Sequence, residues 1–240
     1  MDKDRPRTLI DAVNGDGAVM LAEVERLLNE GHDASERHRS ATSAVQIASR
    51  KCRFDVVALL LEHGAFESDL GWNAVFHAVA FGTTAELEEA VTSGIDLEAR
   101  DHDNRTPFLL AAALGTVEKA ELLMQAGADP LADKLSRSAL LVAIEHDQVA
   151  MLDWLIGQGF PFQGQDRFGW VPLVWAAQLG AVACARALID RGADLHEANY
   201  ADETAIKGAR SPGMVRLLLA AGAGIHDLER DVFRFVHILS

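Results

Sequence analysis

Seven glycines recur along the chain at a nearly constant interval, and this period limits the possible folds more than any other feature of the sequence. They are Gly31, Gly64, Gly94, Gly127, Gly159, Gly192 and Gly222. Successive glycines are separated by 33, 30, 33, 32, 33 and 30 residues. A period of this size indicates an array of stacked repeats, in which each unit packs only against its neighbours.

The clearest copy of the repeated unit lies in residues 101–129. A turn comes first, and Thr106 and Pro107 then supply an N-cap and a first helical residue. An apolar helix follows and stops at Gly115, and a second helix stops at Gly127, which we expect to be a left-handed C-cap. Such a helix-turn-helix unit cannot bury its apolar face alone, so it predicts packing against copies of itself.

This unit resembles the ankyrin repeat, which combines T-P-L-H-x-A, a turn and L-L-x-x-G-A-D. The resemblance is clearest over residues 106–129 and 171–194, is weaker over 56–65 and 205–223, and covers almost the whole chain. It implies an all-α ankyrin-repeat solenoid of about seven stacked helix-turn-helix units with short β-hairpin fingers. The chain departs from the family at the consensus histidine, so the hydrogen bond that this histidine makes between fingers is missing. That position holds Phe76, Leu109, Leu141, Val174 and Lys207.

We expect a single repeat domain over residues 1–240. Residues 1–34 are predicted to form an N-terminal capping repeat, and residues 35–224 the central repeats. Residues 225–240 have the apolar spacing of an amphipathic helix and are predicted to close the array as a C-terminal capping helix. The link over residues 66–72 is about three residues short for this family, which predicts a truncated finger.

Charge and composition favour a protein partner. The formal net charge of −14 argues against non-specific nucleic-acid binding, which requires a basic surface. An acidic array is better suited to a basic protein, although charge that only keeps the protein soluble is an open alternative. The chain shows no apolar run of membrane-spanning length and no apolar signal region at its start. Cys52 and Cys184 lie in distant repeats and are expected to stay unpaired, which fits a reducing compartment, so we expect a cytoplasmic protein. We also expect it to be monomeric when free, because its polar caps should stop end-to-end growth.

The sequence offers little support for chemistry. The nine histidines fall mostly at turns or helix ends of different repeats, without the spacing of a metal site. Nucleophile-elbow and phosphate-binding sequences are absent. His102 between Asp101 and Asp103 resembles an acid–base cluster, but it lies at a predicted finger tip, where turn-forming aspartate is common. We therefore expect no enzyme, no metal and no cofactor.

The family resemblance implies that a partner contacts the finger tips and the exposed edge of each first helix. Trp and Tyr beside Arg are the usual composition of binding hot spots. An alternative is that Trp72, Phe168 and Trp170 pack against neighbouring fingers. The predicted partner-binding residues are Trp72, Phe81, Arg100, His102, Arg105, Leu114, Lys134, Arg137, His146, Arg167, Phe168, Trp170, Leu179 and Tyr200.

These observations predict a non-enzymatic protein–protein interaction module that binds through its concave face and finger tips. One form of this function is an inhibitor that occludes a basic partner, since ankyrin-like proteins also serve bacteria as immunity proteins against toxins. The alternative is a passive scaffold or a stabilising chaperone for an enzyme.

Overall fold

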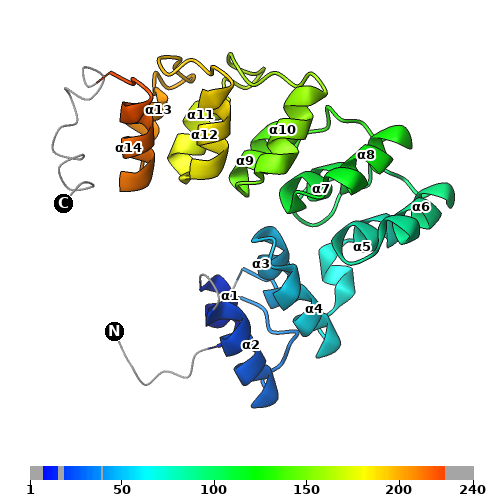
Figure 1. The fold of residues 1–240 in the computed structure, drawn as a ribbon. Helices are drawn as coiled ribbons and strands as arrows, with labels where there is room; N and C mark the ends of the chain where they lie inside the picture. Colours follow the sequence, from blue (N-terminus) through cyan, green and yellow to red (C-terminus); the bar gives the residue numbers. More distant parts are fainter. Residues whose placement is uncertain (1–7, 16–18, 39, 225–240) are drawn as a thin grey trace, which may run out of the picture. The chain divides into compact units, whose positions relative to one another are not determined.

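The computed structural model describes residues 8–15, 19–38 and 40–224. These residues form fourteen α-helices and one 3-10 helix, and strand-like pairing is limited to three isolated β-bridges (Figure 1). The predicted all-α repeat fold with seven helix pairs is confirmed. The predicted carboxyl-terminal capping helix lies outside the described residues, and the predicted domain boundaries stay predictions.

The helices alternate between the first and the second member of each pair, and the 3-10 helix precedes the third pair. In chain order they are α1 (Leu9–Asn14), α2 (Val19–Asn29), α3 (Ala44–Arg50), α4 (Phe54–Glu62), η1 (Glu67–Leu70), α5 (Ala74–Ala80), α6 (Thr84–Thr92), α7 (Pro107–Leu114), α8 (Val117–Gln125), α9 (Ala139–Glu145), α10 (Val149–Gly157), α11 (Pro172–Leu179), α12 (Val182–Asp190), α13 (Ala205–Gly208) and α14 (Pro212–Ala220).

The chain divides into two compact units, one ending at Pro107 and one beginning at Phe108. In the first unit α3 packs on α1 and α4 packs on α2, so the first two pairs stack directly. In the second unit α11 packs between α9 and α13, while α12 packs between α10 and α14. Every residue of α9 from Ala139 to Ile144 is buried, as expected for a first helix that is apolar on all sides.

The second helices end as the recurrent glycines predict. All seven glycines have positive φ, from 75° at Gly94 to 102° at Gly222. At the end of α8, the Gly127 amide donates to the Met124 carbonyl and the Ala128 amide donates to the Leu123 carbonyl. This pair of hydrogen bonds is the Schellman arrangement, which satisfies the last carbonyl groups of the helix and reverses the chain.

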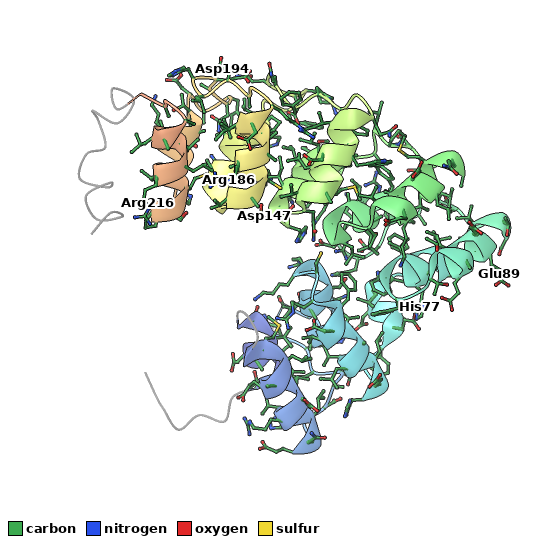
Figure 2. All side chains as sticks on the ribbon, viewed as in Figure 1. His77, Glu89, Asp147, Arg186, Asp194 and Arg216 are labelled. Carbon is green, nitrogen blue, oxygen red and sulfur yellow. The ribbon has the colours of Figure 1, made fainter. Side chains whose placement is uncertain are left out.

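An aspartate two residues after most of these glycines fixes the start of the next finger. Its Oδ1 accepts the backbone amide two residues further on, at distances of 2.8 to 2.9 Å. This Asx turn directs the chain out of the helix layer, as Figure 2 shows at Asp194, which follows α12. The aspartates are Asp33, Asp96, Asp129 and Asp194.

The fingers are tight turns closed by a side chain rather than extended hairpins. Asp166 Oδ1 accepts the amides of both Phe168 and Trp170, at 2.8 and 2.9 Å. Asp101 and Asn199 close their own fingers in the same way, each with two backbone amides. These contacts hold each turn internally, although the consensus histidine is missing.

The shortened link before the third pair is the 3-10 helix η1 in place of a finger. It ends at Gly71, whose φ is 67°. Leu70 is buried, and η1 packs against α3. The three missing residues are therefore accommodated by a single tight turn whose leucine enters the core.

Two glycines separated by one residue test the role of the left-handed cap. Gly157 is the last residue of α10 and Gly159 has a φ of 91°, and a Cβ atom at either position would meet nothing within 4 Å. We expect Gly159→Ala to lower the free energy of unfolding by about 1–2 kcal/mol, because L residues are strained at positive φ. Gly157→Ala should raise it by about 0.4–1 kcal/mol by restricting the unfolded chain. Urea denaturation of both variants measures this; a shift of the same sign in both would contradict the cap.

The hydrogen bonds by which Asp166 closes its finger can be tested by substitution. Asp166→Ala removes the acceptor for two backbone amides and should lower the free energy of unfolding by about 1 kcal/mol. Asp166→Asn should change it little, because Asn199 performs the same task in the next finger. Equal losses in the two variants, measured by chemical denaturation, would show that charge rather than hydrogen bonding matters at this position.

Candidate functional site

Three successive fingers of the second unit each expose a large apolar side chain. Leu135, Phe168 and Tyr200 have exposed fractions of 64%, 37% and 65%. By contrast, α12 and α14 expose charged residues such as Arg186 and Arg216, which Figure 2 labels. We call the part of the second unit that carries these finger side chains and their neighbours the finger surface. It comprises Leu135, Arg137, Arg167, Phe168, Trp170, Trp175 and Tyr200.

A row of stacked groups crosses the finger surface from the fifth repeat to the seventh. The Arg137 guanidinium lies 5.8 Å from the centroid of the Trp175 ring. The Trp175 and Trp170 centroids are 4.7 Å apart, and the Trp170 and Tyr200 rings meet edge to face at 5.5 Å. The Gly169 carbonyl also accepts the Tyr200 amide at 3.1 Å. These contacts hold the rings in place before any partner binds, which reduces the entropy lost on binding.

Close approach between fingers explains why a glycine stands at position 169. Its φ is 79°, and a Cβ atom there would lie 2.7 Å from the Tyr200 Cβ atom. A larger residue would therefore separate the sixth and seventh fingers as well as strain the turn. The aromatic row depends on this glycine.

Leu135 has an unusual backbone for an exposed leucine. Its φ is 49° and that of Ser136 is 68°, so both central residues of the turn are left-handed. Turns of this type favour Asn-Gly, because most other residues are sterically strained at positive φ. For leucine this strain costs roughly 1–2 kcal/mol. Lys134 and Arg137 close the turn with reciprocal backbone hydrogen bonds of 2.9 and 3.0 Å. Backbone strain at a solvent-exposed tip makes Leu135 a candidate for a functional role.

Arg167 and Phe168 form the outer part of the finger surface. The Arg167 guanidinium lies 4.8 Å from the Phe168 ring centroid and also pairs with Asp133 of the preceding finger. The Arg167 side chain is well exposed, so this ion pair adds little stability. It does fix a cation and an aromatic ring side by side at the tip.

The predicted alternative that aromatic rings pack against one another holds in part. Trp170 is half-buried between Trp175 and Tyr200. Trp72 is half-buried and stacks on Phe54 and Phe76, with centroid distances of 5.9 and 6.5 Å. Both tryptophans therefore support neighbouring aromatic rings as well as offering one edge to solvent.

Two predicted finger residues are not exposed. Arg105 is 1% exposed and Lys134 is 3% exposed, so the prediction that their side chains are available on the surface is wrong. Arg105 Nε and Nη2 donate to Asp101 Oδ2 at 2.8 and 2.7 Å. Arg105 Nη1 and Nη2 also donate to the Ser49 carbonyl and Oγ at 3.0 and 2.7 Å. The guanidinium thus ties the fourth finger to α3 inside the first unit.

The other predicted residues occupy separate places. Arg100, His102 and Leu179 are exposed, whereas Leu114 and His146 are half-buried. Phe81 is exposed beside Trp72 in the first unit and is considered below. Trp175 was missed by the prediction, although it occupies the variable position of T-P-L-H-x-A, and that position lies on the edge of the first helix.

Candidate metal ligands and nucleophiles lie among the described residues. Within the described part of the chain, no three His, Cys, Asp or Glu side chains gather as metal ligands would. Burial and the nearby Asp147 carboxylate raise the pKa of the Cys184 thiol, which disfavours the nucleophilic thiolate. Cys52 and Cys184 are both free thiols.

No helix among the described residues has the length and apolar character to cross a lipid bilayer.

The buried ion pair of Arg105 allows a test of its structural role. Arg105→Met leaves the Asp101 carboxylate buried without its cation, and we expect a loss of about 3–5 kcal/mol in the free energy of unfolding. Arg100→Met removes an exposed arginine from the same finger and should change stability by less than about 0.5 kcal/mol. Chemical denaturation compares the two, and an unaffected Arg105→Met protein would contradict the buried pair.

The repeated unit of this chain is similar in sequence to that of known proteins. A family model described as ankyrin repeats (three copies) matches residues 108–199 and 140–229, together about half of the chain. The B-cell lymphoma 3 protein homolog of Mus musculus is 30% identical over 173 residues, and the B-cell lymphoma 3 protein of Homo sapiens is 31% identical over 136 residues. The alignments cover 68% and 56% of this chain. They span only 39% and 30% of those relatives.

Two further similarities concern a fungal protein and a solved structure. The ankyrin repeat protein nuc-2 of Neurospora crassa is 28% identical over 173 residues, which is 70% of this chain and 16% of that protein. The crystal structure of the ankyrin repeat domain of Bcl-3, described as a unique member of the IkappaB protein family, aligns with 91% of this chain at 26% identity. The alignment covers 100% of that domain, with a TM-score of 0.49.

Proposed function

This chain belongs to the ankyrin repeat family, and on that premise we propose that it is a non-enzymatic module that binds another protein through the finger surface. Ankyrin repeats generally mediate protein–protein interactions. The observation that supports this site is the exposure of Leu135, Phe168 and Tyr200 on three successive fingers, above a fixed row of tryptophans. Large apolar side chains grouped on otherwise polar turns are typical of binding surfaces.

The composition of the finger surface also fits a protein interface. Trp, Tyr, Phe and Arg are enriched at the centres of such interfaces, where they bury much area with few rotatable bonds. The rings of Trp170 and Tyr200 are already held by neighbours. A partner therefore meets a rigid surface, and less conformational entropy is lost when the complex forms.

We propose further that the partner is basic, and that binding occludes a functional surface of that partner, as an inhibitor or immunity-type protein does. The net charge of −14 supports this choice, because opposite charge accelerates association. A passive scaffold or stabilising chaperone for an enzyme is the alternative form of the same binding function. Cytoplasmic location and a monomeric free state belong to this proposal.

Affinity capture followed by a binding measurement tests the site. The double substitution Phe168→Ala with Tyr200→Ala should weaken the captured partner's binding by tenfold or more, as truncation of interface anchors typically costs about 2 kcal/mol. Its unfolding free energy should change by less than about 1 kcal/mol, because both side chains lie on exposed turns. Calorimetric titration of full-length wild-type and variant proteins gives both affinities.

A control separates the site from general loss of exposed apolar surface. Phe66→Ala removes an exposed phenylalanine of the first unit and should leave the affinity unchanged. If Phe66→Ala weakens binding as much as the double variant does, the finger surface is not the site. One tight partner whose activity falls on binding favours inhibition, whereas several weak partners with unchanged activity favour a scaffold.

A further inference from the structure

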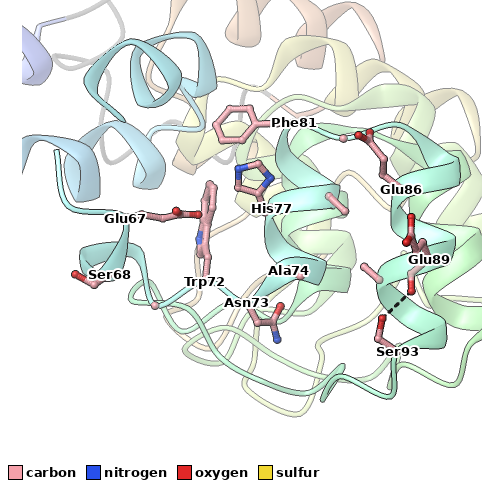
Figure 3. A pocket seen from close by; sticks show the side chains of 14 residues that line it. Glu67, Ser68, Trp72, Asn73, Ala74, His77, Phe81, Glu86, Glu89 and Ser93 are labelled. Carbon is pink, nitrogen blue, oxygen red and sulfur yellow. Dashed lines mark hydrogen bonds between the residues drawn. The ribbon is translucent and has the colours of Figure 1, made fainter. Parts of the chain in front are cut away.

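An open groove of about 720 Å³ lies in the first unit, between η1, α5 and α6. Figure 3 shows the Glu67 carboxylate beside the Trp72 ring in one part of the groove, and Glu86 and Glu89 on α6 in another. We call it the aromatic groove. The residues that define it here are Glu67, Trp72, His77, Phe81, Glu86 and Glu89.

The aromatic part of the groove is built by ring packing across two repeats. Phe54 begins α4 and is buried, and its ring lies 5.9 Å from Trp72 and 6.1 Å from Phe81. Trp72 and Phe81 are 5.9 Å apart, and His77 contacts Phe81 edge to face at 5.3 Å. Phe54 contacts both Trp72 and Phe81, and Phe76 stacks on Trp72, so these contacts hold the two rings in place without a ligand.

Incomplete stacking leaves this aromatic cluster open. Among the described helices, α6 lacks the close packing on α4 that joins α4 to α2 and α12 to α10. The finger that would precede α5 is also replaced by the short η1 turn. Phe81 is 37% exposed at the end of α5, beside this opening.

The groove lining includes three glutamates and neither lysine nor arginine. Residues 54–99 contain no lysine or arginine, yet they carry nine of the chain's carboxylates. Glu67 and Glu89 line the groove and form no ion pair within the described residues, and Glu86 forms a capping box with Thr83. Two of them, Asp55 and Asp69, pair with Arg53 and Arg37, which lie outside this segment. The nine acidic residues are Asp55, Glu62, Glu67, Asp69, Glu86, Glu88, Glu89, Asp96 and Glu98.

We propose that the aromatic groove binds a lysine or arginine side chain from a basic segment of a protein partner. The faces of Trp72 and Phe81 attract a cation through the ring quadrupole, and this attraction increases when the site excludes water. Glu67, beside the Trp72 ring in Figure 3, and Glu89 on α6 supply the opposite charge. The aliphatic part of the same side chain covers the apolar atoms.

Other occupants fit the groove less well. An apolar side chain would desolvate the carboxylates without a compensating charge, and an acidic one would be repelled. A cation with an apolar stem satisfies both parts of the lining at once. The groove's volume also leaves room for backbone atoms on either side of the inserted residue.

Indole resonances provide a site-specific test with hexalysine as the probe. The chain has four tryptophans, so only four indole signals need to be assigned by substitution. Hexalysine titrated into the full-length protein should shift the Trp72 signal saturably, and hexaglutamate should not. Glu67→Gln with Glu89→Gln should weaken hexalysine binding at least fivefold. Phe81→Leu, which keeps apolar bulk but removes a ring face, should weaken it at least threefold.

A charge-matched control keeps the proposal falsifiable. Glu62→Gln with Glu88→Gln removes the same charge from the same unit, outside the groove lining, and should alter the affinity by less than twofold. Equal weakening by both double variants, or a shift confined to Trp154, Trp170 and Trp175, would overturn the proposal. The inference rests on the proposed protein-binding function only where it takes a protein as the source of the basic side chain. Because the probe requires no natural partner, its failure leaves the finger-surface experiment unaffected.

Discussion

The left-handed glycine at the end of each second helix is the constraint on which the rest of the fold depends. It lets two backbone amides, such as those of Gly127 and Ala128, satisfy the last carbonyl groups of the helix while the chain reverses. The following aspartate then directs the chain outward into a finger. Since the same sequence of bonds recurs about every 33 residues, first helices begin at equivalent places, and α3 stacks on α1 as α11 stacks on α9.

The helix pairs could be predicted from the sequence because their determinants are local. The glycines, the apolar first helices and the N-caps all lie within a few residues of the structure they specify. Which finger residues face solvent could not be predicted in the same way. The guanidinium of Arg105 is buried by Ser49, 56 residues earlier in the chain, and no nearby residue indicates that contact. Trp72 was likewise placed on a finger tip, although Phe54 and Phe76 half-bury it.

The two candidate surfaces arise from opposite departures from a regular repeat. On the finger surface, packing between neighbours is close: Gly169 allows Tyr200 to approach, and the aromatic row is continuous. In the aromatic groove packing is incomplete, because α6 does not cover the rings beside α4. The sequence offered no sign of the groove, since its opening depends on a contact that two helices do not make. The groove's residues were visible only as a shortened link and as two separate candidates, Trp72 and Phe81.

Three fingers are each closed by their own aspartate or asparagine, and this has a consequence for how the protein evolves. In Asp166–Trp170, the closing contacts are made by one carboxylate and backbone amides, so they do not depend on the identity of the side chains at the tip. Residues at the tip can then change under selection for recognition, while the hydrogen bonds of the aspartate or asparagine maintain the loop. A lineage that retains these closing hydrogen bonds can change its binding specificity one finger at a time, without changes in the helices that carry the fingers.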